Sequence, residues 1–378
     1  MSDSYSDVSN RSLGDNLIDS IKGVLVGLVL FAASFPLLWW NEGRTDISTV
    51  AKKAAVMKPD GSTQAAGEGK LIAVTEAIKS SGTLGDPDYL KAGAYVSLRR
   101  EAEMYAWVEK VTKKEEKKLG GGTKVTTTYT YDKQWTARPQ SSDDFRHPED
   151  HENPPMTVSS QSWLSPSATV GVYGFAPEDI TLPSPRPVAV SSENLLPGKG
   201  KKSGDFYFVG RGSVEQPLLG DVRIAWTGIE SGRRVTAYGK QQGTQLVAYM
   251  HDGKDKLYRV VDGTHEEAIA SLHGEHTTLT WILRLMGFLF MWFGLALVLG
   301  PIQAVLDILP FLGSTSRALT GIVLFPVALV LTSVTVLVAI VAHNPILLIG
   351  VVVLVVGGVA FLIKRRADQK QGQRQVGA

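Results

Sequence analysis

The last quarter of the chain, from Trp281 to Ile363, most constrains what this sequence can fold into. Its only formal charges are Arg284, Asp307 and Arg317. A hydrocarbon layer about 30 Å thick takes about 20 helical residues per crossing, and backbone groups inside it must satisfy their own hydrogen bonds, so the crossings are helical. The sequence therefore predicts a membrane protein, with crossings in this region at 281–300, 321–342 and 346–363.

The segment 301–320 is apolar but interrupted by Asp307, Pro310 and Gly313, which predicts an interfacial segment on the cytoplasmic side, with a helical piece folded into the bundle as the alternative. Ahead of the first of these crossings, Thr264-x-x-Glu267 forms a capping box. It predicts that a helix over 264–280 leads into the membrane.

A further crossing is predicted near the N-terminus, over 22–40. Gly23–Trp40 carries no charge and ends in two tryptophans, as expected at a membrane interface. A cleavable signal peptide is the alternative, but the acidic leader argues against it. Residues 1–21 have no apolar period and are interpreted as a flexible cytoplasmic tail.

Charge near the helix ends predicts the orientation. The tail 364–378 carries five lysines and arginines, whereas the turn at 343–345 carries none. The positive-inside rule therefore places the C-terminus in the cytoplasm. Four crossings place the N-terminus there as well, and the large central domain on the exoplasmic side.

The central residues 41–263 have mostly strand-like patterns. Aromatic and β-branched residues alternate with polar ones over 99–111 and again over 124–135, which predicts a long β-hairpin with a solvated tip of lysines, glutamates and glycines between the strands. Shorter strands are predicted at 71–74, 206–209, 222–226, 234–238 and 245–250. The fold class is therefore an α-helical membrane protein with four transmembrane helices plus a large β-rich (α+β) extramembrane domain. A barrel or a twisted sheet are the two forms this domain could take.

Composition excludes several functions. The chain of 378 residues has no cysteine, which excludes disulfides, thiolate metal sites and cysteine nucleophiles. Its net charge of +2 gives no basic excess that would indicate nucleic acid as a partner. No phosphate-binding, dinucleotide or nucleophile-elbow motif is present, so neither catalytic residues nor a cofactor are predicted.

Several blocks resemble the LUMA (transmembrane protein 43) family, and Leu98–Glu109 is the most specific of them. The others, in the same order as in the family, are Asn41–Arg44, Tyr129–Trp135, His151–Pro154, Gly204–Tyr207 and Gly220–Arg223. The resemblance implies a membrane scaffold without an established enzymatic activity, whose domain has been likened to an oligonucleotide/oligosaccharide-binding (OB) barrel. It also implies a lumenal domain in the endoplasmic reticulum and inner nuclear membrane of animal cells. A prokaryotic inner membrane with a periplasmic domain is the favoured location, because no eukaryotic sorting signal is evident.

The expected function is thus a membrane scaffold that assembles membrane-protein complexes. The expected partners are membrane lipids, other integral membrane proteins and further copies of the chain, and no nucleic acid. A channel or transporter subunit is the alternative, but the membrane segments hold few polar groups. A non-catalytic subunit of a membrane-bound enzyme complex is a third possibility.

Candidate sites follow from these assignments. A divalent metal could bind the loop of Asp143, Asp144, His147 and His151, although a solvated acidic loop is favoured because no regular spacing is present. Candidate contact residues are Asn41, Glu42, Gly43, Arg44, Arg99, Arg100, Glu103, Tyr105, Trp107, Tyr131 and Trp135. For those in the hairpin, a strand face packed under the rest of the domain is the favoured interpretation. Helix packing in the membrane is expected at Gly23, Gly27, Thr332, Ser333, Thr335, Gly350 and Gly357.

Overall fold

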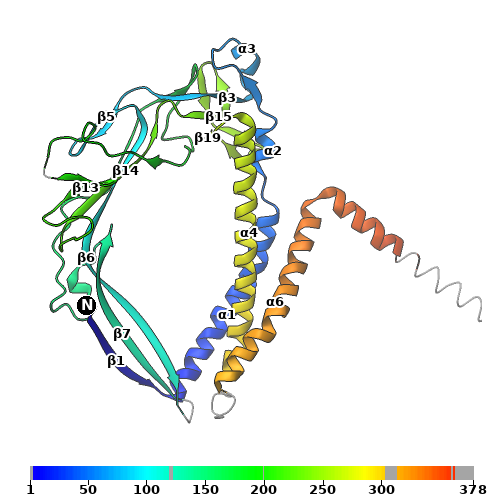
Figure 1. Cartoon of the computed structure of the whole chain (residues 1–378). Coiled ribbons are helices and arrows are strands. Elements are labelled where there is room, and N and C mark those ends of the chain that lie inside the picture. The colour runs from blue at the N-terminus through cyan, green and yellow to red at the C-terminus, as the bar shows by residue number, and fades with distance from the viewer. Residues whose placement is uncertain (1–2, 119–121, 199, 303–312, 359–360, 362–378) are drawn as a thin grey trace, which may run out of the picture. The chain divides into compact units, whose positions relative to one another are not determined.

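The computed structural model describes residues 3–118, 122–198, 200–302, 313–358 and 361. The chain divides into two compact units (Figure 1). The first, built mainly of strands, comprises the chain up to Ser9, Asp46–Lys114 and Val125–His276. The second, built mainly of helices, comprises Asn10–Thr45, Glu115–Lys124 and the chain from Thr277 onward.

A closed five-stranded barrel forms the centre of the first unit. Its strands are β3 (Leu71–Ser80), β9 (Ala168–Val170), β10 (Tyr173–Phe175), β15 (Arg234–Gln242) and β16 (Gln245–Val247). The ring closes because β15 pairs with both β16 and β3, while β10 pairs in parallel with β16. Around the barrel the strands occur in the order β3, β9, β10, β16 and β15, so the last two strands along the chain are exchanged. This is a Greek-key barrel of the OB type, and it confirms the barrel alternative for the β-rich domain.

Side chains fill the barrel interior. Ile72, Val74, Tyr173, Val235 and Leu246 are all buried in one hydrophobic cluster. Strands β2 (Ala55–Met57) and β19 (Arg259–Asp262) extend the barrel sheet beside β3 and β15. The barrel is therefore a packed core and not a channel.

A second, eight-stranded sheet grows mainly from two long insertions in the barrel, one between β3 and β9 and one between β10 and β15. Its order is β1–β7–β6–β14–β13–β12, with β8 on β6 and β11 on β14. Their bounds are β1 (Asp3–Arg11), β6 (Tyr95–Lys117), β7 (Thr123–Thr136), β8 (Gln161–Leu164), β11 (Arg186–Pro187), β12 (Lys201–Ser203), β13 (Phe206–Val209) and β14 (Val222–Glu230). Two separate strand pairs are β4 (Leu84–Asp86) with β5 (Leu90–Gly93), and β17 (Tyr249–His251) with β18 (Asp255–Leu257).

The long hairpin predicted from the alternating pattern is confirmed as the neighbouring strands β6 and β7. Ala102, Met104 and Ala106 of β6 are fully buried, while the residues between them are half-buried. Strand β6 continues to Lys117, through the charged residues that we predicted as part of the tip. Of the predicted glycine tip, residues 120 and 121 lie outside the described residues.

The N-terminal residues differ from the flexible tail that the sequence predicts for 1–21. Residues 3–11 form β1, which pairs with β7, and α1 (Leu13–Glu42) begins directly afterwards. The Ser12 hydroxyl accepts a hydrogen bond from the Asp15 backbone N–H, and the Asp15 carboxylate accepts one from the Ser12 N–H, at 3.1 and 2.9 Å. This capping box starts the helix in a stretch that has no apolar period.

Among the residues that the structure describes, three helices are long and apolar enough to cross a membrane: α1, α4 (His265–Val298) and α6 (Gly313–His343). The predicted capping box is confirmed, because the Thr264 N–H donates to Glu267 Oε2 at 2.8 Å and α4 starts at the next residue. The helix leading into the membrane and the second crossing are therefore one continuous helix. Short helices in the strand-built unit are α2 (Ile47–Ala51), α3 (Gln64–Gly67) and the 3₁₀ helix η1 (Ser142–Asp144).

The fourth predicted crossing, 346–363, stays a prediction. A shorter apolar helix covers Pro345–Gly358, and Asn344 Oδ1 caps it by accepting hydrogen bonds from two backbone N–H groups. Except for Phe361, the later residues of this crossing and the whole basic tail 364–378 lie outside the described residues. The same holds for 303–312 with Asp307, whereas 313–320 of the predicted interfacial segment belong to α6.

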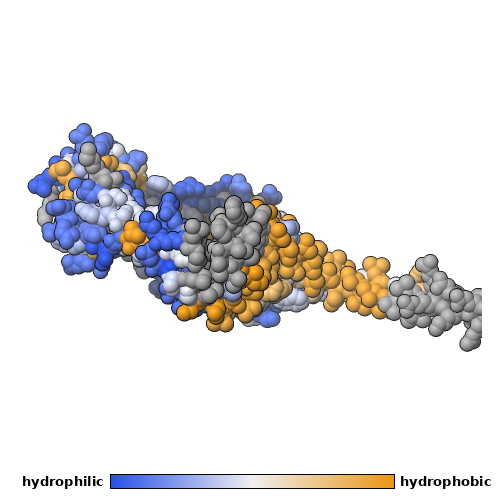
Figure 2. All heavy atoms as spheres, turned by 90° about the horizontal axis from the view of Figure 1, so that it is seen from below, coloured by the Kyte–Doolittle hydropathy of each residue, from blue (hydrophilic) through white to orange (hydrophobic). Residues whose placement is uncertain are grey.

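The surface of the helical unit is apolar. Large side chains including Leu25, Val29, Val330 and Leu337 are exposed on α1 and α6. Figure 2 shows the hydrophobic colour concentrated on the helical segments, while the strand-built unit is largely hydrophilic. An apolar surface of this extent is covered by lipid in a membrane protein.

Candidate functional site

The end of α1 is bound to α4 through Asn41. Asn41 is 2% exposed. Its side-chain N–H groups donate to the Thr280 carbonyl of α4 at 3.2 Å and to Glu42 Oε1 at 3.1 Å. Burial without these partners would leave the amide unsatisfied, so the contact specifies where α1 meets α4.

Glu42 makes the strongest polar contact of this junction. Arg284 of α4 donates from Nε and from a terminal nitrogen to the two carboxylate oxygens, at 2.8 and 2.7 Å. The Glu42 side chain is only 5% exposed, and the guanidinium also lies over the Trp281 ring at 4.9 Å. A bidentate pair shielded from water is both strong and specific in direction.

Gly43 brings α6 into the same junction. A Cβ atom at this position would lie 2.5 Å from His343 Nε2, so only glycine fits without displacing the ring. His343 Nδ1 donates to its own helix, at the Ala339 carbonyl, and the ring also contacts Trp39 at 4.8 Å. The residues 41–43 therefore join three helices at one level, and Arg44 follows with its guanidinium 5.8 Å from the Trp40 ring.

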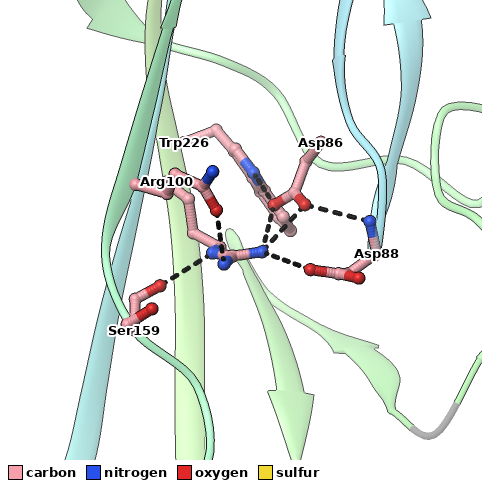
Figure 3. A network of polar contacts seen from close by, with 6 residues as sticks. Asp86, Asp88, Arg100, Ser159 and Trp226 are labelled. Atoms are coloured by element: carbon pink, nitrogen blue, oxygen red, sulfur yellow. Dashed lines mark hydrogen bonds and ion pairs between the residues drawn. The ribbon is translucent and has the colours of Figure 1, made fainter.

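Arg100 lies in a second, separate site inside the strand-built unit (Figure 3). Its guanidinium donates to both oxygens of Asp86 at 2.8 and 3.0 Å, to Asp88 at 3.2 Å and to the Ser159 carbonyl at 2.9 Å. Asp86 also accepts a hydrogen bond from Trp226 Nε1 at 3.0 Å. Arg100 is 4% exposed and Asp86 is fully buried, so the network is a buried ion pair with its hydrogen bonds satisfied.

We expected Arg100 to share a contact face with the hairpin aromatics, and the structure corrects this. Even-numbered residues of β6 point to the core, so Arg100 lies on the buried side with Ala102 and Met104. Arg99 lies on the other side, exposed, and pairs with Glu101 at 3.4 Å.

The opposite face of the hairpin carries a row of polar and aromatic contacts. Glu103 accepts a 2.6 Å hydrogen bond from Arg223, which is its cross-strand neighbour on β14. The same guanidinium lies 4.7 Å from the Trp135 ring, and Trp135 contacts Tyr105 at 5.5 Å. This face is half-buried, with Glu103 34% and Arg223 22% exposed, so water and partners can still reach it.

Tyr131 connects the hairpin to the following loop. Its hydroxyl donates to Glu109 and accepts from the His147 backbone N–H at 2.9 Å. Its ring stacks on His151 at 4.0 Å, and His151 in turn contacts Trp107 at 4.7 Å. The pKa of the Tyr131 hydroxyl is raised to about 12, mainly because the group is buried and secondly because it donates to Glu109.

This shift gives a testable pH dependence. The fold binds the phenol proton more tightly than the unfolded chain, whose tyrosine pKa is about 10. The protonated Tyr131 hydroxyl therefore makes its full contribution to the free energy of unfolding below pH 10, and this contribution is lost as the pH rises towards 12. In a spectrophotometric titration of tyrosinate absorbance, Tyr131→Phe should remove one late step. Tyr238, whose pKa burial also raises, gives the matched control, since Tyr238→Phe should remove a different late step.

The metal candidates do not converge. Asp143 and Asp144 lie exposed in η1, while His147 and His151 turn towards the aromatic rings of the hairpin. Across the part of the chain that the structure describes, no group of three or more histidine, aspartate or glutamate side chains could hold a metal ion.

A polar cleft was not anticipated from the sequence. It has a volume of about 1000 Å³ and lies where β14 and β19 end and β15 begins. Arg233, whose side chain is 10% exposed, pairs with Asp262 and donates to the Ser184 carbonyl at 2.8 Å, and Arg186 lies 3.7 Å from Asp262. The cleft is lined by three arginines, Arg186, Arg233 and Arg234, and three carboxylates, Glu230, Asp262 and Glu267. The positive and negative charges lining the cleft are therefore equal in number. In the sequence, the adjacent pair Arg233–Arg234 was the feature from which the cleft could have been predicted.

The expected membrane packing positions fall into two groups. A Cβ at Gly27 would lie 2.8 Å from the Gly294 carbonyl, so α1 and α4 approach closely there, and Gly23 lies beside Leu297. Thr332 is buried with its hydroxyl 3.5 Å from Met291 Sδ. Thr335 donates to the Leu331 carbonyl of its own helix at 2.8 Å.

The second group has no such contacts. Ser333 is exposed on α6. Among the described residues nothing lies within 4 Å of a Cβ atom at Gly350 or Gly357, so their packing role stays a prediction.

Comparison with known proteins identifies the family. The sequence model of the family described as transmembrane protein 43 matches residues 104–345, which is more than half of the chain. This chain belongs to the transmembrane protein 43 family. The matched residues begin within β6 and include four of the five barrel strands, β9, β10, β15 and β16, and the long helices α4 and α6.

Individual members of the transmembrane protein 43 family show how far the likeness extends. The rat (Rattus norvegicus) protein is 29% identical over 314 residues, and the human (Homo sapiens) protein 28% over 314 residues; each alignment covers 78% of both chains. The Drosophila melanogaster homolog is 26% identical over 295 residues, 75% of this chain and 78% of its own. No solved structure matches this chain.

Proposed function

We propose that this member of the transmembrane protein 43 family is an integral membrane scaffold, which displays its β-rich domain on the periplasmic or lumenal side and assembles membrane-protein complexes. The observation that supports this most is the junction at residues 41–43, where Asn41 and Glu42 bind α4 and Gly43 admits His343 of α6. A junction of this kind fixes the anchoring helices to one another. Fixed helices suit attachment, whereas transport needs helices that move past one another and polar groups that face a pathway.

The scaffold proposal is tested in native membranes. The full chain is cross-linked in place, purified with detergent, and its companions are identified by mass spectrometry. A reproducible set of integral membrane proteins, enriched over that found with an unrelated membrane protein of similar abundance, supports a scaffold. Recovery of the chain alone, or ion flux in proteoliposomes that hold only this chain, contradicts it.

The orientation can be tested by cysteine labelling, because the chain has no cysteine of its own. We expect Thr244→Cys, in the exposed turn after β15, to react with a membrane-impermeant maleimide added to the outside of spheroplasts or to the lumen of microsomes. Reaction from the cytoplasmic side alone would reverse the proposed orientation.

Self-association can be separated from packing within the chain. Ser333 is exposed whereas its neighbour Thr332 is buried against Met291. We expect Ser333→Leu to change the amount of detergent-resistant oligomer more than Ser333→Ala does, while thermal stability stays close to the original. Thr332→Leu should instead lower thermal stability, since it overpacks the interior by about 1–3 kcal/mol. Equal oligomer yields for the two Ser333 variants would remove Ser333 from the association surface.

A further inference from the structure

Strand β1 is the edge strand of its sheet and pairs with β7, in the way that a bound peptide adds a strand to a sheet. Three of its side chains at alternate positions, which point to the same side of a strand, meet partners in the loop after β7. The Tyr5 ring stacks on the His147 ring at 4.4 Å, the Asp7 carboxylate accepts from Arg146 Nε at 3.3 Å, and Asp3 lies 3.4 Å from His151 Nε2. The edge of β7 therefore has an aromatic slot flanked by two basic groups.

This occupant is held weakly. Along β1 only Asp7 is half-buried, and every other residue from Asp3 to Arg11 is exposed, including Tyr5 at 41%. The Arg146–Asp7 pair is exposed by 61% and 45%, and ion pairs of this exposure contribute little. A strand with so few buried contacts can leave at small energetic cost.

The chain connectivity requires β1 to leave when α1 crosses a bilayer. Strand β1 directly precedes α1, and the β-rich domain directly follows it. A complete crossing by α1 puts β1 on one side of the membrane and β7 on the other. The edge of β7 is then open next to the rings of His147 and His151, which Tyr5 and Asp3 of β1 otherwise contact.

We propose that the open edge of β7 is a docking site for an extended segment of a partner protein on the exoplasmic side. The partner segment adds to the sheet as a strand, places an aromatic ring on His147, and carries carboxylates two residues before and after that ring for His151 and Arg146. Strand β1 has this pattern and occupies the site when α1 is not in a bilayer. This inference rests on the proposed scaffold function and names the chemistry of the partner.

Peptide binding to the full chain in lipid nanodiscs tests the site. The probe is a fluorescent peptide with the sequence of residues 2–11, SDSYSDVSNR, and binding is followed by anisotropy. We expect saturable binding that weakens about ten-fold or more with Arg146→Glu, or when the peptide tyrosine is replaced by alanine. Lys91→Glu, a charge reversal on β5 outside this sheet, is the matched control and should bind as the original chain does. No saturable binding, or equal binding by Arg146→Glu, overturns the proposal.

A cysteine pair tests whether the site is open. Ser6 Oγ and Thr128 Oγ1 lie 3.1 Å apart across β1 and β7, so Ser6→Cys with Thr128→Cys should form a disulfide in detergent and exclude the peptide. In nanodiscs the disulfide should form poorly. Complete disulfide formation there shows that β1 stays on β7 and overturns the proposal. Should the partners of the cross-linking experiment persist with Arg146→Glu, the scaffold function stands and this docking site does not.

Discussion

Arg100→Met is expected to destabilise the β-rich domain by about 3–5 kcal/mol, because it leaves the fully buried Asp86 carboxylate without its cation. The Trp226 N–H would still donate to Asp86, but one neutral donor does not replace a guanidinium that contacts both oxygens. For a domain of this size the melting temperature should fall by roughly 10 °C. Circular dichroism of the β-sheet signal, recorded in detergent during heating, measures the change.

The neighbouring arginine is the matched control for this effect. Arg99 lies one residue away on the opposite face of β6, and its pair with Glu101 is about half exposed, so Arg99→Met should change stability by less than about 1 kcal/mol. Arg100→Met combined with Asp86→Leu should be more stable than Arg100→Met alone, because the unpaired buried charge is gone. Equal melting temperatures for Arg99→Met and Arg100→Met would show that the network does not stabilise the fold.

The period-2 pattern was enough to predict the hairpin, but it could not give the partners of Arg100. Alternation depends only on local geometry, so β6 and β7 could be read directly from 99–111 and 124–135. The partner of Arg100 is Asp86, which lies in β4. That contact depends on how the insertions of the barrel fold back on each other, and local sequence does not encode it. An arginine between buried apolar positions was the available signal.

The barrel and the N-terminus show two further reasons for the difference. The strands β9, β10 and β16 have only three residues each, which is too short for an alternating pattern, so the closure of the barrel could not be derived from periodicity. Strand β1 is polar and exposed, and it is held by pairing with β7 and by contacts to the loop after β7, both distant in sequence. A segment whose structure depends on a distant strand resembles a flexible tail in sequence.

The apolar helices could be predicted from the sequence. For the junction between them, the sequence indicated residues 41–44 as contact residues but not the residues that they contact. Hydrophobic length identified α1, α4 and α6. Glu42 was predicted as a contact residue but without a partner, since sequence separation gives no sign that it meets Arg284. Their contact follows from the close approach of α1 and α4, which Gly27 and Gly294 permit.

Glu42→Ala is expected to weaken the junction more than any other single change in the helical unit. It leaves Arg284, which is 24% exposed, without its bidentate partner at the edge of the apolar region. Removal of one member of such a pair costs about 3 kcal/mol when both are buried, and partial exposure of Arg284 reduces this to about 2 kcal/mol. The expected result is a lower melting temperature of the helical signal in detergent and a larger fraction of chain lost by aggregation on heating.

The exchange Glu42→Arg with Arg284→Glu distinguishes the pair from its separate charges. The double variant should recover part of the lost stability, since the ion pair is restored with its direction reversed. The control is Asp19→Ala on the same helix, whose pairs with Lys22 at 3.7 Å and with Arg11 at 3.3 Å are exposed on both sides, so the change should cost less than about 1 kcal/mol. If the double exchange is no more stable than Glu42→Arg alone, the two charges do not act as a pair. The junction would then be held by Asn41 and by the fit of Gly43 against His343.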